Sequence, residues 1–192
     1  ASWLRDFASG RYAVLIAAAV LIAVIAVGGA VYRSHAYTAA VEKEILSIRA
    51  LYNQTRNEMR SYQNSRQLER NNTGSVRFLE FYAKNGEDIR LIVRSGAVES
   101  GYETAEYYYD GGTLYVAFVV TRYSQRTRGE NWYCFKEGKL IRWLVGKEEK
   151  EISRDDSSFV AEGKRVLAVG EKIRSEYQPE EPAGERLFPH ME

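Results

Sequence analysis

An internal repeat of 26 residues limits the possible folds of this chain more than any other feature. It is seen when Glu80–Val93, Glu106–Val119 and Trp132–Val145 are aligned. Each copy carries an aromatic residue, a glycine five positions later, and then apolar residues at every second position. The aligned sets are Phe81, Tyr107 and Tyr133; Gly86, Gly112 and Gly138; Ile89, Tyr115 and Ile141; Leu91, Ala117 and Trp143; and Val93, Val119 and Val145. Because glycine accepts the positive φ of tight hairpins, each copy predicts a strand, a turn and a strand.

Three successive hairpins predict an antiparallel β-meander of about six strands. The last three aligned sets recur with a period of two, so we expect them to share one face of the sheet. A 26-residue period is also compatible with a solenoid. However, only three copies are present and helical patterns flank them, which favours a closed α+β domain.

The segment before the repeat has a helical pattern from Tyr37 to Tyr62. Its apolar stripe consists of Val41, Ile45, Ile48, Tyr52, Thr55, Met59 and Tyr62. The alternating spacing of four and three residues also fits a coiled coil, but the stripe is short and includes Thr and Tyr, so packing on the chain's own sheet is favoured. The polar residues from Ser61 to Ser75 predict a loop.

A second helix is expected after the sheet. Arg154, Asp155, Asp156 and Ser157 supply the acidic and capping side chains typical of a helix N-terminus. One face then carries Phe159, Gly163, Val166, Gly170, Ile173 and Tyr177. The two glycines on this face would allow the helix to approach the sheet closely, and Pro179 ends the pattern.

No charged residue lies between Arg11 and Arg33. A helix from Tyr12 to Tyr32 would span about 30 Å, the thickness of a bilayer hydrocarbon core. A cleavable signal peptide is the alternative, but its apolar region would be only about 7 to 15 residues long. Arg5 and Arg11 favour a cytoplasmic N-terminus.

These features predict four regions, in which a C-terminal domain lies on the periplasmic or extracellular side of the membrane. They are a cytoplasmic tail (1–11), a transmembrane helix (12–32), an extracytoplasmic α+β domain (33–177) and an extended tail (178–192). Small residues recur along the predicted transmembrane helix at Ala19, Ala23, Ala26 and Ala30. This spacing suggests a helix-packing interface, although alanine also inserts simply because it is apolar.

The reactive residue types are sparse and scattered. Cys134 is the only cysteine, which excludes an intrachain disulfide and a thiolate-rich metal site. His35 and His190 lie outside the expected folded core. The acidic residues Glu99, Glu103, Glu106 and Asp110 lack the spacing of a calcium loop. We therefore expect no catalytic residue, no metal and no cofactor.

The charges suggest contacts with protein or lipid. With 27 basic and 26 acidic residues, the net charge of +1 disfavours nucleic acid as a partner. Arg122, Arg126 and Arg128 form the most basic stretch of the domain, between the second and third hairpins. They could contact a partner protein or anionic lipid headgroups, or they could simply be solvated.

The sequence therefore favours a non-enzymatic, single-pass accessory subunit of a larger membrane complex. Its partners would be other membrane subunits, contacted through the transmembrane helix and the C-terminal tail, while homo-oligomerisation is possible but not favoured. The alternative is an extracytoplasmic ligand-binding or sensory module that uses an aromatic sheet face. A deep pocket lined by Tyr108, Tyr115 and Trp143 would favour that alternative.

Overall fold

The computed structural model describes residues 38–70, 76–99, 101–123 and 128–177. The chain divides into two units, residues 1–44 and 45–192, and each is considered by itself. In the first unit, the described residues 38–44 are helical. The predicted transmembrane helix (12–32) and C-terminal tail (178–192) lie outside the described residues. Within the described ranges, no helix is both long and apolar enough to cross a membrane.

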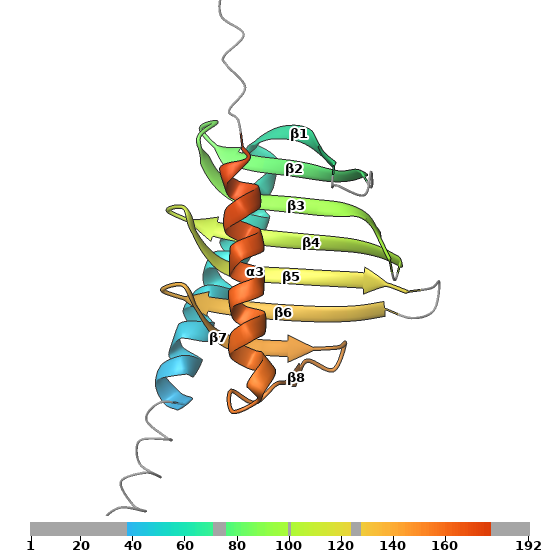
Figure 1. Cartoon of the computed structure of the whole chain (residues 1–192). Helices are drawn as coiled ribbons and strands as arrows, with labels where there is room; N and C mark the ends of the chain where they lie inside the picture. The colour runs from blue at the N-terminus through green and yellow to red at the C-terminus, as the bar shows by residue number, and fades with distance from the viewer. Residues whose placement is uncertain (1–37, 71–75, 100, 124–127, 178–192) are drawn as a thin grey trace, which may run out of the picture. The chain divides into compact units, whose positions relative to one another are not determined.

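The second unit contains an eight-stranded antiparallel sheet whose strands follow one another in sequence order (Figure 1). The strands are β1 (Gln63–Arg70), β2 (Val76–Lys84), β3 (Asp88–Val98), β4 (Gly101–Asp110), β5 (Thr113–Arg122), β6 (Arg128–Lys136), β7 (Lys139–Val145) and β8 (Lys150–Glu151). The three repeats are the hairpins β2–β3, β4–β5 and β6–β7. Their turn glycines have φ values of +80°, +76° and +70°. The β-meander and its α+β class are confirmed, but it has eight strands because β1 and β8 extend it at its two edges.

The loop expected from Ser61 to Ser75 is wrong for most of its length, since Gln63–Arg70 forms β1. This strand pairs with β2 through its whole length, from Gln63 opposite Ala83 to Arg70 opposite Val76. Polar residues are compatible with an edge strand, because one of its sides faces solvent and its backbone still pairs with the next strand. Composition alone therefore suggested a loop where pairing with β2 creates a strand.

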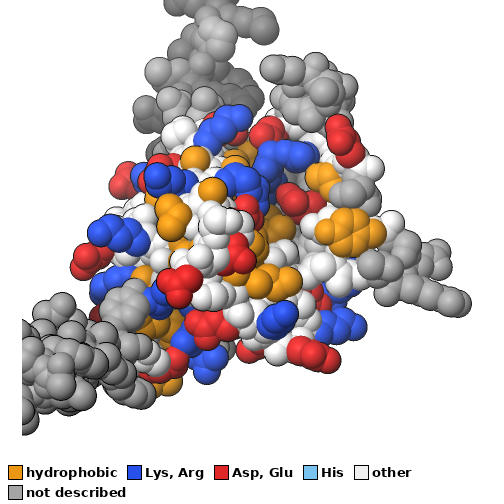
Figure 2. Space-filling view, turned by 60° about the horizontal axis from the view of Figure 1, so that its bottom comes forward, with side chains coloured by type: hydrophobic (Ala, Val, Ile, Leu, Met, Phe, Trp, Pro, Cys, Tyr) orange, Lys and Arg blue, Asp and Glu red, His pale blue; other side chains and the backbone are white. Residues whose placement is uncertain are grey.

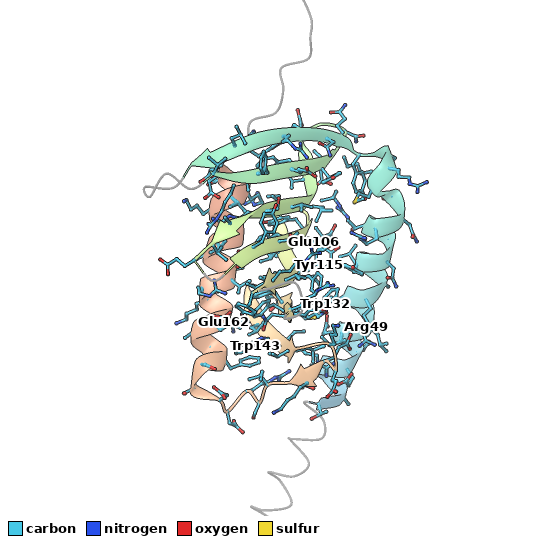
Figure 3. All side chains as sticks on the ribbon, turned by 90° about the vertical axis from the view of Figure 1, so that its right-hand side faces the viewer. Arg49, Glu106, Tyr115, Trp132, Trp143 and Glu162 are labelled. Carbon is cyan, nitrogen blue, oxygen red and sulfur yellow. The ribbon has the colours of Figure 1, made fainter. Side chains whose placement is uncertain are left out.

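Two helices cover opposite faces of the sheet (Figures 1 and 3). The helical segment ends at residue 58 and is followed by the 3₁₀ turn η1 (Met59–Ser61). Its part within the second unit, here called helix 45–58, packs on one face of the sheet. Helix α3 (Ser157–Ser175) covers the other face. Asp156 caps α3 by accepting a hydrogen bond from the Ser158 amide at 2.8 Å, which confirms the predicted N-terminus.

The main core lies between the sheet and α3, on what is here called the α3 face. Phe81, Tyr107 and Tyr133, one from each repeat, are all buried there with Val166 and Ile173 of α3. The predicted glycine contacts are confirmed. A Cβ at Gly163 would lie 2.7 Å from Leu140 Cβ, and one at Gly170 would lie 3.0 Å from Leu114 Cδ2.

The expectation that three aligned apolar sets share one face is wrong, because every hairpin contains a β-bulge. Pairing skips Arg90, Tyr115 and Ile141, so one residue of the second strand is added in each hairpin. Ile89 consequently lies in the core on the α3 face, whereas the Tyr115 hydroxyl contacts Thr55 of helix 45–58. An extra residue reverses the alternation beyond it, since side chains alternate with a period of two.

Candidate functional site

The face covered by helix 45–58, here called the 45–58 face, carries the candidate sites. Cross-strand partners place Tyr82, Leu91, Tyr108, Val116, Cys134 and Arg142 in one row across this face. A parallel row contains Glu80, Val93, Glu106, Phe118, Trp132 and Leu144. The helix crosses the half of the sheet in which the turns of the three repeat hairpins, β2–β3, β4–β5 and β6–β7, lie (Figure 1).

Beneath the C-terminal half of the helix, the space is filled by interacting aromatic and polar side chains. Tyr108 is fully buried, and its ring lies 4.8 Å from that of Tyr52 in an edge-on arrangement. The hydroxyls of Thr55 and Tyr115 are 3.0 Å apart. Burial raises the pKa of Tyr115 to about 12, which keeps its phenol neutral.

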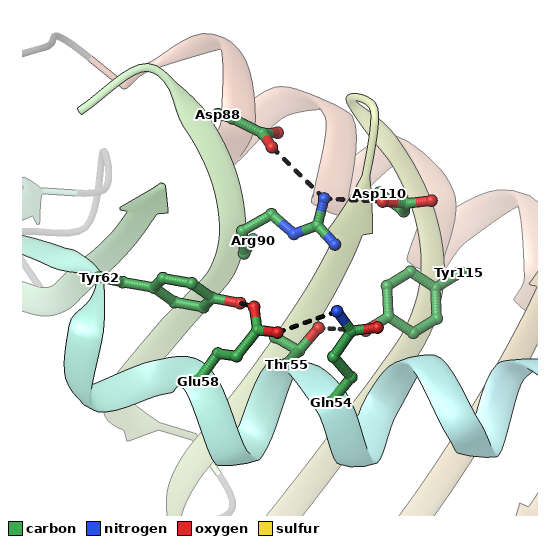
Figure 4. A network of polar contacts seen from close by, with 8 residues as sticks. All are labelled: Gln54, Thr55, Glu58, Tyr62, Asp88, Arg90, Asp110 and Tyr115. Carbon is green, nitrogen blue, oxygen red and sulfur yellow. Dashed lines mark hydrogen bonds and ion pairs between the residues drawn. The ribbon is translucent and has the colours of Figure 1, made fainter. Parts of the chain in front are cut away.

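A polar network surrounds this contact (Figure 4). Glu58 accepts hydrogen bonds from Gln54 at 2.9 Å and from the Tyr62 hydroxyl at 3.0 Å. Arg90, the bulge residue of the first hairpin, lies 3.3 Å from Asp88 and 2.7 Å from Asp110. Within this network, the contact between Thr55 and Tyr115 joins the helix to β5, and Arg90 Nε is buried without a hydrogen-bond partner among the described residues.

A cavity of about 410 Å³ lies farther along the same face. Its helix wall consists of Ile45, Ile48, Arg49, Tyr52 and Asn53. Its sheet wall consists of Val116, Trp132, Cys134, Arg142 and Leu144, with Glu149 from the β7–β8 turn. Arg49, Asn53 and Glu149 are exposed, so they form the rim through which the cavity opens to solvent.

Beyond the helix, the outer half of the 45–58 face exposes apolar side chains. The residues here called the apolar strip are Leu68, Val76, Phe78 and Tyr102. Leu68 of β1 pairs with Phe78 of β2, and β3 lies between these residues and Tyr102, with Ser95 opposite Phe78 and Ala97 opposite Tyr102. The exposed fractions are 59% for Leu68, 41% for Phe78 and 45% for Tyr102.

The predicted contact residues are only partly described. Ala19, Ala23, Ala26, Ala30 and Arg126 lie outside the described residues. Arg122 and Arg128 are cross-strand partners, and Arg122 is in turn opposite Tyr102. The two arginines therefore lie at one end of the apolar strip, where Arg128 also pairs with Glu130 at 2.9 Å.

The pocket expected from Tyr108, Tyr115 and Trp143 is not formed. Tyr108 and Tyr115 are buried against helix 45–58, whereas Trp143 packs against the core on the α3 face (Figure 3). Trp143 is in register with Tyr133 and Ala117 on the α3 face, whereas the bulge in the second hairpin places Tyr115 on the opposite face from Ala117. The cavity that does form is lined by Trp132 and Tyr52 instead.

The acidic candidates do not converge. Glu106 lies on the 45–58 face, 3.6 Å from Arg56. Asp110 pairs with Arg90. Glu103 is three residues from Glu106 on β4, so its side chain lies on the α3 face of the sheet. In the described part of the chain, no three His, Cys, Asp or Glu side chains are grouped so that they could hold a metal ion. Figure 2 shows basic and acidic side chains interspersed on the face in view.

Comparison with protein-family models, curated proteins and solved structures gave no match.

Proposed function

We propose that this chain is a non-enzymatic accessory subunit of a membrane protein complex, anchored by the predicted transmembrane helix at residues 12–32. The observation that supports this proposal is the apolar strip on the outer half of the 45–58 face. Exposed apolar side chains gathered on one face of a small domain commonly mark a contact surface for another protein. A chain that positions or stabilises a complex needs such a surface rather than a catalytic group.

The two faces differ in a way that supports a partner on one of them. On the outer half of the 45–58 face, Leu68, Phe78 and Tyr102 point outward. On the α3 face the same part of the sheet carries the ion pair between Glu69 and Arg94, at 2.9 Å. Glu69 and Arg94 already pair with each other, whereas exposed aromatic rings gain free energy when a partner covers them.

The chemistry of the expected partner follows from the end of the strip. Arg122 and Arg128 border it beside Tyr102, so the partner should present an apolar surface with acidic residues at its edge. Arginine beside aromatic residues is a combination enriched in protein interfaces. A membrane subunit with an acidic, apolar extracytoplasmic surface fits this description.

Extraction of the full chain from its native membrane in a mild detergent, followed by native mass measurement, tests the proposal. We expect additional subunits in the measured mass. Phe78→Asp combined with Tyr102→Asp should release them while the domain stays folded, because both side chains are partly exposed and lie outside the core. Val160→Asp is the matched control, since Val160 is 59% exposed but lies on α3.

Two results would contradict the proposal. One is a wild-type chain that leaves the membrane as a folded monomer. The other is a double variant that keeps all its subunits. Binding of the wild-type chain to vesicles of anionic lipid, lost in the double variant and with no subunit in the measured mass, would assign the strip to lipid instead.

A further inference from the structure

The third hairpin departs from the other two at one position of the repeat. Tyr82, Tyr108 and Cys134 are equivalent, since each is 26 residues from the next and all lie on the 45–58 face. The Tyr108 ring is fully buried and packs against Tyr52 beneath helix 45–58. A thiol is far smaller than a phenol, and Cys134 lines the cavity. The cavity therefore lies where the third hairpin lacks the phenol ring that the second hairpin has.

The spacing of helix 45–58 matches that of the hairpins. Two strand spacings in a sheet measure about 9.6 Å, and seven residues of an α-helix measure about 10.5 Å. A step of 26 residues in the sheet therefore corresponds to a step of seven residues in the helix. Arg56 contacts the Tyr108 hydroxyl of the second hairpin, and Arg49, seven residues earlier, lines the cavity with Cys134 of the third. Each of these two hairpins thus has an arginine above the same repeat position.

The Tyr108 hydroxyl shows how a phenol is held at this position. It donates a hydrogen bond to Glu106 at 2.5 Å and accepts a longer one from Arg56 at 3.4 Å. A carboxylate and a guanidinium thus share one phenol oxygen, the first as acceptor and the second as donor. Hydrogen bonds to charged groups of this kind are stronger than those between neutral groups.

The cavity presents the same two kinds of group. Arg49 lines it from the helix and Glu149 from the β7–β8 turn. Among the described residues, neither side chain has a hydrogen bond or an ion pair. The carboxylate comes from a different element than in the second hairpin, because Trp132 stands at the repeat position of Glu106. One guanidinium and one carboxylate at the rim balance each other in charge, and together they suit a hydroxyl group, which both donates and accepts.

The remaining walls suit an aromatic ring. Trp132 is held by Phe118, with ring centroids 4.0 Å apart, and it meets Tyr52 edge-on at 5.7 Å. Arg142 donates to Glu151 at 3.2 Å, so its charge is paired within the chain. A cavity of about 150 Å³ is enough for benzene, and this one has about 410 Å³. A single ring can therefore pack on Trp132 without ordering the protein further.

We propose that this cavity binds a small uncharged phenol, whose ring takes the place that the Tyr108 ring has in the second hairpin and whose hydroxyl lies between Arg49 and Glu149. The proposal goes beyond the accessory role and does not depend on it, because the apolar strip lies on a different part of the sheet. Cys134 contributes space rather than reactivity. Burial raises the pKa of its thiol to about 11, so it stays neutral.

Fluorine NMR of the full chain in detergent micelles, labelled with 5-fluorotryptophan, tests the proposal. The probes are 4-methylphenol, which copies the tyrosine side chain, and toluene, which lacks only the hydroxyl. We expect a saturable shift of the Trp132 signal, whereas the signal of Trp143, on the opposite face, should stay in place. At equal free concentration, 4-methylphenol should bind about ten-fold more tightly than toluene, the effect of hydrogen bonds to charged groups. A purely apolar cavity would prefer toluene instead, because burying a hydroxyl without a partner is unfavourable.

Two variants separate the hydroxyl contacts from the space. Arg49→Met keeps an apolar side chain of similar length but removes the donor, so it should weaken 4-methylphenol binding about five-fold and leave toluene unchanged. Arg60→Met, outside the cavity, is the matched control and should change neither. Each probe is compared between proteins, so its partition into micelles cancels. Cys134→Tyr, which copies the other hairpins, should abolish binding of both probes. If Cys134→Tyr does not fold, the Arg49→Met comparison decides alone.

Five outcomes would overturn the proposal. A missing or unsaturable Trp132 shift, a Trp143 shift that follows it, and toluene binding as tight as that of 4-methylphenol are the first three. The fourth is unchanged binding of 4-methylphenol to Arg49→Met. The fifth is undiminished binding to a folded Cys134→Tyr variant.

Discussion

The hydroxyl of Tyr109 donates a hydrogen bond of 2.7 Å to the carbonyl oxygen of Gly170, and both groups are buried. This bond joins the end of β4 to α3, and it can form because glycine at position 170 lets the helix backbone come close to the ring. A Cβ on this residue would lie 3.3 Å from the Tyr109 hydroxyl oxygen. The repeat thus supplies a tyrosine and the helix a glycine, and together they fix the distance between the two layers.

Tyr109→Phe should lower the free energy of unfolding by about 1–3 kcal/mol. The ring remains, but the carbonyl oxygen of Gly170 loses its side-chain partner in a buried place. Denaturant unfolding of the full chain measures the change. Tyr123→Phe is the control, because Tyr123 is 54% exposed and its replacement should change stability by less than about 0.5 kcal/mol. Equal losses in the two variants would refute a specific role for this bond.

Gly163→Ala should destabilise the domain by about 1–3 kcal/mol, although alanine is the better helix former. The added methyl group would lie 2.7 Å from Leu140 Cβ, an atom close to the backbone that cannot rotate away. The exposed position Ala168 provides the opposite case, since Ala168→Gly should cost about 1 kcal/mol through helix propensity alone. Thermal unfolding of both variants distinguishes the effects, and a stabilised Gly163→Ala variant would show that α3 can shift freely.

The ion pair between Arg94 and Glu69 should stabilise β1 at the edge of the sheet. Two bonds of 2.9 and 3.2 Å join the side chains, which are only 13% and 12% exposed. Glu69→Gln should cost about 1–3 kcal/mol, because Arg94 would keep its charge without a charged partner.

Hydrogen exchange of the β1 amides provides the local measurement for Glu69→Gln, and faster exchange is expected there first. Lys172→Met serves as the comparison. Lys172 pairs with Glu176 at 3.7 Å on an exposed helix surface, and its loss should change little. Unchanged exchange of β1 in Glu69→Gln would contradict the proposed stabilisation.

The buried tyrosines should make the domain sensitive to alkali. Burial raises the pKa of Tyr107 and Tyr115 to about 12, above the ordinary value of about 10. Their contribution to the free energy of unfolding is fully present below about pH 10, where these tyrosines are protonated in both the folded and the unfolded chain. It is lost as the pH rises toward 12, because the unfolded chain releases these protons first.

Each such tyrosine should lower the free energy of unfolding by about 1.4 kcal/mol per pH unit in that window. Denaturant unfolding between about pH 9 and 11.5 measures the slope, and Tyr115→Phe should reduce it by one tyrosine's share. Its lost contact with Thr55 lowers stability equally at every pH and leaves the slope unaffected. An unchanged slope in this variant would show that Tyr115 ionises normally in the folded domain.

Much of the architecture followed from local patterns. The glycines of the repeat predicted three hairpins, the stripe of Phe159, Val166 and Ile173 predicted α3, and Asp156 predicted its first turn. These patterns are readable because turn geometry, capping and amphipathic spacing act between residues that are close in the chain. The polar β1 was missed, since only its pairing with β2 makes it a strand.

The candidate sites were harder to predict. Arg122 and Arg128 were recognised by charge, but their position beside Tyr102 depends on strand register. The bulges at Tyr115 and Ile141 moved side chains from one face to the other, so the expected grouping of Tyr108, Tyr115 and Trp143 failed. A bulge leaves little mark in a sequence because it inserts one residue of ordinary type.

By itself, the sequence determined that this chain contains a hairpin meander between two amphipathic helices, because those features depend on the spacing of neighbouring residues. It also contained the substitution of Cys134 for the tyrosine of the other repeats. Only the tertiary structure decided that this substitution leaves a cavity, since the space depends on where helix 45–58 crosses β6 and β7. The same holds for the apolar strip, which is exposed because both helices cross the other half of the sheet.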